Sequence, residues 1–465
     1  MSKPTPLSGF PEFLPAQRFV EQQVIATLAR TFELHGFASV ETRAVEPMDQ
    51  LLRKGDTSKE VYVLRRLQEE DSARDNGMGL HFDLTVPFAR YVLENAGKLE
   101  FPFRRYQIQK VWRGERPQEG RFREFTQADI DIVGKDTLPF HHDVEVTRVM
   151  LDALAQLASP ESIGLPGFRL QVNNRKLIQG FYAGLGAPDV DEVMRLIDKL
   201  DKLPVAEVKK LLVAEAGLTD EQADRCLELA TIKSSDDSFV ERVRALGVTG
   251  ELLDEGLDEL ATLIRACAPL TASDSLANKV SIVADLSIAR GLDYYTGTVF
   301  ETRLDGYESL GSICSGGRYD ALASDGRTTY PGVGISLGVS RVLVPLAQRG
   351  LLSADRQVPS AVLVALNDEE SRPAADATAT ALRSRGIACE VAPTPAKFGK
   401  QIRFAERRGI PYVWFAARQD DGSVADQVKD IRSGEQVPAD ADTWQPPAQD
   451  LRPRVVLSDH STREN

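Results

Sequence analysis

Arginine side chains gather in one short segment of the chain, WRGERPQEGRFREF. It contains Arg113, Arg116, Arg121 and Arg123, and it ends in Phe125. A guanidinium group stays charged at physiological pH and binds an oxyanion through two parallel hydrogen bonds. The segment therefore predicts a bound anion beside a flat ring. A charged surface loop would have the same composition, so this segment alone does not decide between the two interpretations.

A row of polar side chains follows on the next predicted strand. Residues 125–133 alternate, so that Phe125, Gln127, Asp129 and Asp131 share one face while small and branched apolar residues occupy the other. A hairpin normally turns one face to the core and one to water. A row that joins amide and carboxylate groups to an arginine-rich loop predicts a pocket for a small polar ligand. Either Asp129 or Asp131 can be its central acid.

The composition excludes several classes of protein. With 465 residues the chain is too long for one ordinary domain, and no apolar run approaches the about 20 residues that span a bilayer. The N-terminus lacks a secretory layout, so we predict a cytoplasmic location without a membrane. The net charge of −13 argues against indiscriminate nucleic-acid binding. The four cysteines form no CxxC and the five histidines are not spaced as a metal pair, so no metal site is predicted.

Two common nucleotide-binding motifs are missing from the sequence. There is no GxxxxGK(S/T), and no GxGxxG follows a predicted strand; GVGISLG at 332–338 has the wrong spacing. An anion site in this chain is therefore neither a P-loop nor a dinucleotide fingerprint.

Four blocks of sequence occur in order along the chain. They are WRGERPQEGRFREF (112–125), ARGLDYYTGTVFE (289–301), SGGRYDAL (315–322) and GVGISLGVSR (332–341). The first and last resemble motifs 2 and 3 of class II aminoacyl-tRNA synthetases, and the middle two resemble blocks peculiar to histidyl-tRNA synthetases. HIGH and KMSKS, which mark the other synthetase class, are absent. The chain thus resembles a histidyl-tRNA synthetase over nearly its whole length.

The resemblance implies an α/β (α+β) fold, in which an antiparallel class II sheet is flanked by helices. We expect a catalytic domain over residues 1–350, and a helical insertion over about 176–275, where helical periods replace strand signals. A linker over 351–359 leads to a small α/β anticodon-binding domain over 360–440. Residues 441–465 form a C-terminal tail. A helix is predicted to begin after Pro87.

The resemblance also assigns roles to individual residues. ATP-binding residues are Arg113, Glu115, Arg121, Phe125 and Arg341, and the catalytic residues are Arg113, Arg290 and Arg341. Activation brings a carboxylate to the α-phosphorus of ATP, so fixed cations and Mg²⁺ are expected to offset the repulsion. The histidine site is assigned to Asp83, Thr85, Gln127, Asp131, Tyr294 and Tyr295. Relatives read LRPEGT or LRYDLT where this chain reads LHFDLT. His81 therefore replaces an arginine, and a structural role for it is favoured over a substrate contact.

The implied activity is ATP-dependent ligation of histidine to the 3′ end of tRNA(His) through a histidyl-adenylate, by a homodimer. The alternative is a non-catalytic paralogue, either a regulatory subunit of histidine biosynthesis or a sensor of uncharged tRNA. Such regulators lack an anticodon-binding domain, and degenerate copies tend to lose the ATP arginines. This chain is predicted to have an anticodon-binding domain, and it keeps the arginines assigned to ATP. Both observations favour the enzyme.

Overall fold

The computed structural model describes residues 4–52, 60–67, 77–271, 279–289, 294–418 and 424–458. It divides into two compact units. The first comprises Met1–Pro11 and Gln23–Pro345, and the second comprises Glu12–Gln22 and Leu346–Asn465. Within the described ranges, no helix has the length and apolar character required to cross a membrane.

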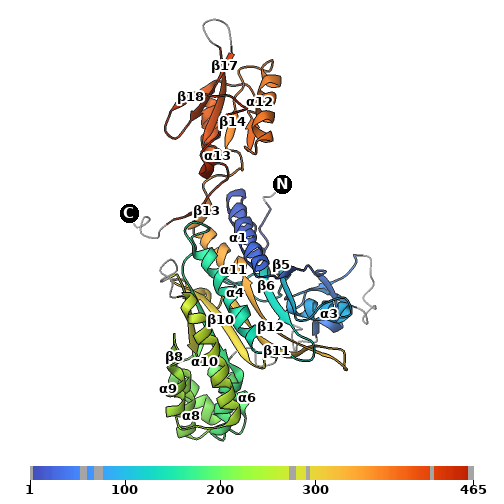
Figure 1. Ribbon diagram of the computed structural model, residues 1–465, viewed down its shortest axis with the longest axis vertical. Helices are drawn as coiled ribbons and strands as arrows, with labels where there is room; N and C mark the ends of the chain where they lie inside the picture. The colour runs from blue at the N-terminus through green and yellow to red at the C-terminus, as the bar shows by residue number, and fades with distance from the viewer. Residues whose placement is uncertain are drawn as a thin grey trace. The chain divides into compact units, whose positions relative to one another are not determined.

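A nine-stranded sheet forms the centre of the first unit (Figure 1). Its strands in spatial order are β1 (Ala38–Ser39), β5 (Phe103–Trp112), β6 (Glu124–Val133), β12 (Thr329–Gly338), β11 (Cys314–Ser324), β10 (Thr298–Leu304), β7 (Phe168–Asn174), β9 (Val280–Asp285) and β8 (Lys233–Ser234). From β5 to β7 every neighbouring pair is antiparallel. The expected antiparallel sheet is confirmed.

The register of this sheet extends the polar row across neighbouring strands. Asp129 of β6 lies opposite Gln107 on β5 and opposite Ser336 on β12. The alternate residues Ile130 and Ile132 are fully buried. Helix α4 (His141–Ala158) packs against β6, β7, β9 and β12. Because one face of the sheet is apolar and buried, the functional groups are confined to the other.

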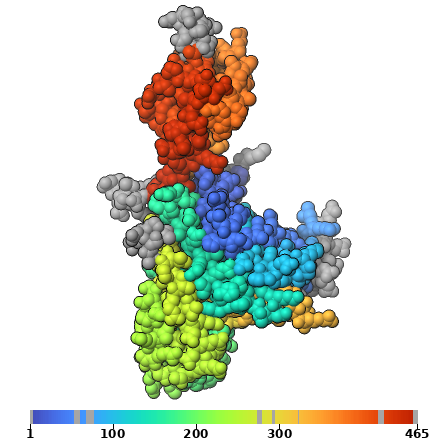
Figure 2. Space-filling view, in the orientation of Figure 1, coloured from blue at the N-terminus to red at the C-terminus, as the bar shows by residue number. Residues whose placement is uncertain are grey.

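Helices surround the sheet and build the insertion. The first unit contains α2 (Met48–Leu51), α3 (Thr85–Asn95), α5 (Arg175–Gly184), α6 (Val190–Ile197), α7 (Val205–Ala214), α8 (Asp220–Ala230), α9 (Phe239–Ala245) and α10 (Glu251–Thr271). Helix α1 spans Pro15–Leu34 and α11 spans Val339–Gln348. Figure 2 shows the residues coloured green to yellow-green gathered in one lobe of the first unit, where Figure 1 labels α6, α8, α9 and α10.

Helix α3 begins earlier than the sequence predicts. It starts at Thr85, two residues before Pro87. The carboxylate Oδ1 of Asp83 accepts a hydrogen bond from the Val86 amide at 3.0 Å, which satisfies a donor in the first turn. Beside this helix lies a three-stranded sheet of β2 (Val45–Pro47), β4 (Met78–Leu80) and β3 (Val63–Leu64).

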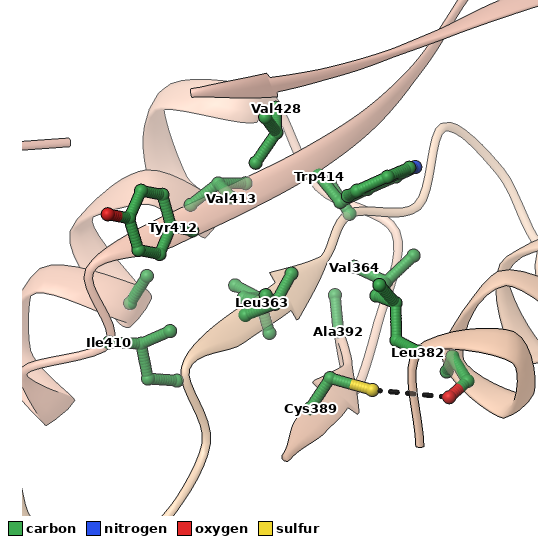
Figure 3. Packing of buried hydrophobic residues seen from close by; sticks show 14 of the residues in the cluster. Leu363, Val364, Leu382, Cys389, Ala392, Ile410, Tyr412, Val413, Trp414 and Val428 are labelled. Carbon is green, nitrogen blue, oxygen red and sulfur yellow. Dashed lines mark hydrogen bonds between the residues drawn. The ribbon is translucent and has the colours of Figure 1, made fainter. Parts of the chain in front are cut away.

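The second unit contains a five-stranded sheet of its own. Its order is β15 (Cys389–Val391), β14 (Val362–Val364), β16 (Tyr412–Arg418), β17 (Val424–Asp430) and β18 (Gln436–Pro438), with helices α12 (Arg372–Ser384) and α13 (Phe398–Arg408). Apolar side chains from these strands and from α12 form its core, where the Cys389 thiol donates to the Ala379 carbonyl (Figure 3). The expected α/β arrangement is present.

One part of the predicted linker is regular structure. Within residues 351–359, β13 (Leu352–Ala354) pairs antiparallel with β19 (Val455–Leu457) of the predicted tail. The sequence interpretation missed this pairing because a three-residue strand has too few alternations to reveal its period, and its partner lies about a hundred residues away.

Candidate active site

A cavity of about 210 Å³ lies at the loop end of the β5–β6 hairpin. All five residues predicted to bind ATP line it, together with one predicted histidine-site residue: Arg113, Glu115, Arg121, Phe125, Arg341 and Gln127. They come from the hairpin and from the start of α11. The fold therefore brings together the cations of two distant sequence blocks.

Backbone carbonyls hold the two predicted motif arginines in place. Arg113 Nε donates to the Phe82 carbonyl at 3.0 Å, and Arg341 Nε donates to the Leu310 carbonyl at 3.1 Å. The Arg113 guanidinium also lies 5.2 Å from the centre of the Phe125 ring, within cation–π range. Positive charge fixed in this way needs little reorganisation when an anion binds.

A second, smaller cavity adjoins the first. Its lining includes Thr85, Asp129, Asp131, Tyr294 and Tyr295, and Ser315 and Ser336 line both cavities. Its volume of about 20 Å³ is close to the space that one water molecule needs. The space that the described residues enclose there is therefore smaller than an aromatic ring.

Asp131 is held by side chains from two other strands of the sheet, β5 and β11. Its Oδ2 lies 2.6 Å from Arg105 Nη2 in a buried ion pair, and its Oδ1 accepts a hydrogen bond from the Tyr319 hydroxyl at 2.8 Å. Burial raises the pKa of Tyr319 well above its usual value, so the phenol stays a donor. A Cβ added to Gly334 would lie 2.0 Å from Asp131 Oδ1, so only glycine fits opposite this acid.

Asp129 has a different environment two residues away. It is buried, and its Oδ1 has no hydrogen-bond partner among the described residues, whereas Ser336 bonds to the carboxyl group. Burial raises the pKa of Asp129 to about 7, and the charges of Asp131 and Asp83 add to this effect while Arg105 opposes it. The carboxyl group of Asp129 therefore titrates near neutral pH.

The other predicted residues lie in different settings. Asp83 is buried at the start of α3 and is not among the described residues that line either cavity. His81 is buried and stacks on Trp112, and its Nε2 donates to the Lys110 carbonyl at 2.7 Å. Because burial lowers the pKa of His81, the ring is a neutral structural group. Arg290 lies outside the described residues.

The sequence interpretation assigned no role in the site to Arg105 or Tyr319, nor to the two serines that line both cavities, Ser315 and Ser336. Extending the alternation of Gln107 and Gln109 back by one step would have placed Arg105 on the polar face. Ser336 carries no such signal, because its position opposite Asp129 depends on the pairing of β6 with β12. Among the described residues, no three His, Cys, Asp or Glu side chains come together as metal ligands.

Comparison with known proteins gives a consistent result. A family model described as histidyl-tRNA synthetase matches residues 9–342, and one described as an anticodon binding domain matches residues 360–443. Relatives named histidine–tRNA ligase are similar: one from Cutibacterium acnes is 59% identical over 460 residues, covering 98% of this chain and 99% of its own length. One from Micrococcus luteus is 56% identical over 470 residues, covering 98% of this chain and 99% of its own length. A crystal structure of histidyl-tRNA synthetase from Nostoc sp. superposes with a TM-score of 0.82 at 34% identity, covering 95% of this chain and 98% of that one.

Proposed function

Because the chain belongs to the histidyl-tRNA synthetase family and attaches histidine to tRNA, we propose that its two adjoining cavities divide the substrates. ATP occupies the large cavity and histidine the small one. The observation that carries this proposal is the wall shared by the cavities at Ser315 and Ser336. The carboxylate of a histidine bound in the small cavity would reach the phosphates of ATP across this shared wall.

In the large cavity, Arg113 and Arg341 bind the phosphates of ATP while Phe125 stacks on adenine. The carbonyl-anchored guanidinium groups support this assignment. Glu115, which lies 3.8 Å from Arg121, is the acid that the sequence assigns to the nucleotide. Mg²⁺ prefers phosphate and water ligands supplemented by one or two carboxylates, and Glu115 fits that need. When bound, Mg²⁺ neutralises phosphate charge.

Activation joins two negatively charged reactants. A carboxylate oxygen of histidine attacks the α-phosphorus, forming histidyl-adenylate as the bond to pyrophosphate breaks. A hydroxyl of the terminal tRNA ribose then attacks the activated carbonyl and releases AMP. Arg113 and Arg341 lower the first barrier because fixed cations stabilise the charge that develops on phosphate oxygens. Arg290 joins them at the α-phosphate by its match to the family block.

In the small cavity, Asp131 accepts a hydrogen bond from an imidazole nitrogen. Tyr319 and Arg105 support this role because they fix the orientation of the carboxylate. Asp83 and Thr85 serve the amino-group side, Gln127 lines the substrate together with Asp131, and Tyr295, with Tyr294 beside it, closes around the ring. An amino acid without a polar ring cannot make this hydrogen bond and would place an apolar side chain against a buried carboxylate, which favours histidine.

The remaining partners follow from the family. Residues 360–443 bind the anticodon of tRNA(His), the protein works as a homodimer, and it acts in the cytoplasm. We keep the expected division into a catalytic domain over 1–350 with its helical insertion at about 176–275, and an anticodon-binding domain that begins near residue 360. No observation favours the regulatory alternative, and the match to an anticodon-binding model opposes it.

Pyrophosphate exchange tests the proposal. The purified protein should exchange labelled pyrophosphate into ATP with histidine, and with none of the other amino acids supplied singly. Exchange without added amino acid, or with a different one, would overturn the assignment. Arg121→Ala should raise the KM for ATP, while Arg327→Ala, an exposed arginine in the β11–β12 turn, serves as the control.

A further inference from the structure

Two acids stand on the same face of β6, but only one has both carboxylate oxygens engaged. Asp131 uses its oxygens for Arg105 and Tyr319. Asp129 is only 3% exposed and its Oδ1 has no hydrogen-bond partner among the described residues. A buried polar atom without a partner is costly, and such atoms are uncommon in folded proteins. Because Asp129 lines the small cavity, a hydrogen-bond donor on a ligand bound there would remove this cost.

The charge around Asp129 favours a cation. The negative charges of Asp131 and Asp83 raise the pKa of Asp129, and the positive charge of the Arg105 guanidinium lowers it. Arg105 is already committed to its ion pair with Asp131. An incoming positive group at Asp129 would therefore relieve repulsion between the carboxylates.

The position of Asp129 along the strand identifies which part of the ligand it meets. Gln127 lines the large cavity, Asp131 lines the small one, and Asp129 stands between them. Side chains on one face of a strand are spaced by about 7 Å. In histidine, the α-carbon that bears the ammonium group likewise lies between the carboxylate, which must reach ATP, and the imidazole ring.

We propose that Asp129 receives the α-ammonium group of histidine, while Asp131 stays bound to Arg105 and Tyr319 and contacts the ring. An ammonium group has three N–H donors, so Asp129 joins Asp83 and Thr85 on the amino-group side and does not replace them. This assignment rests on the proposed function, because it requires histidine in the small cavity. It also separates the roles of the two acids that the sequence leaves open.

The test compares two ligands that differ only in the ammonium group. Histidine and 3-(imidazol-4-yl)propionate are titrated calorimetrically into the full-length wild-type protein, Asp129→Asn and the control Asp136→Asn, an exposed residue in the loop after β6. Asp129→Asn should weaken histidine binding about tenfold or more, the difference between a charged and a neutral acceptor. The same variant should change the affinity for the propionate by no more than about twofold, because that ligand has no ammonium group to interact with the charge of Asp129.

Three results would overturn the proposal or its premise, and they are distinguishable. Unchanged histidine affinity in Asp129→Asn, or equal losses for both ligands, would show that Asp129 does not receive the ammonium group. A wild-type protein that fails to bind histidine would instead remove the proposed function. Asparagine has nearly the shape of the protonated acid, so the variant should fold. Asp129→Ser, checked by thermal melting, provides a second variant with the same expected pattern.

Discussion

Replacing Gly334 by alanine should separate the Asp131 carboxylate from Arg105 or Tyr319. A Cβ at this position would lie 2.0 Å from Asp131 Oδ1 and 2.7 Å from the Ile130 carbonyl, where real Cβ atoms essentially never approach within 3.0 Å. The Ile130 carbonyl belongs to the β6 ladder and cannot retreat without breaking it. The Asp131 carboxylate must therefore move by about 1 Å or more, away from Arg105 or Tyr319.

The cost of this movement follows from the partners that it separates. Arg105 and Asp131 are both buried, and breaking a buried ion pair costs about 3–5 kcal/mol. We expect the variant to lose up to that amount of unfolding free energy. Independently, a misplacement of about 1 Å at a reacting ligand reduces catalysis by about 10²-fold. Histidine-dependent exchange should fall by that factor in kcat/KM, with the KM for ATP nearly unchanged.

Pyrophosphate exchange at varied histidine and varied ATP, together with chemical denaturation, measures these effects. Gly97→Ala is the matched control, because a Cβ at Gly97 meets no atom within 4 Å. Circular dichroism establishes that both variants fold. If Gly334→Ala keeps the histidine KM and the stability of the wild type, the crowding inferred between β6 and β12 is wrong.

Four further predictions test other parts of the molecule. Tyr319→Phe removes a donor to Asp131 and should raise the KM for histidine about tenfold without changing that for ATP; equal changes in both would contradict the role. Arg341→Lys keeps the charge but loses the planar fork, so exchange should slow by about 10–100-fold in kcat while the melting temperature holds. Asp450→Asn should lower the free energy of unfolding of the second unit by about 1–3 kcal/mol, measured by chemical denaturation with tryptophan fluorescence as the signal. The hydrogen bond from Arg432 lowers the pKa of Asp450 below its value of about 4 in the unfolded chain. The stabilisation is therefore fully present above about pH 4 and is lost as the pH falls through the lower pKa of the folded state. Burial raises the pKa of the Cys226 and Cys314 thiols to about 12, so a thiol reagent at pH 8 should label them only after denaturation, and rapid labelling of the native protein would contradict their burial.

The sequence by itself determined the elements with strong local signals. Alternation assigned Gln127, Asp129 and Asp131 to one face of a strand, and the structure confirms that strand as β6. The arginine blocks predicted a site in which Arg113 and Arg341 cooperate, and both line the large cavity. Their contacts with ATP stay a prediction. These successes depend on chain periodicity and on short motifs, which are properties of neighbouring residues.

Tertiary structure alone decided which partner each polar group has. Asp129 and Asp131 are equivalent in the sequence pattern, but the pairing of β6 with β5, and of β12 with β6 and β11, gives Asp131 its arginine and its tyrosine. The same pairing leaves Oδ1 of Asp129 without a hydrogen bond from any residue that the structure describes. The pairing of β13 with β19 is equally invisible to local pattern. Register and pairing depend on how distant segments bury their apolar faces together, and burial then sets the pKa and the hydrogen bonds of each acid.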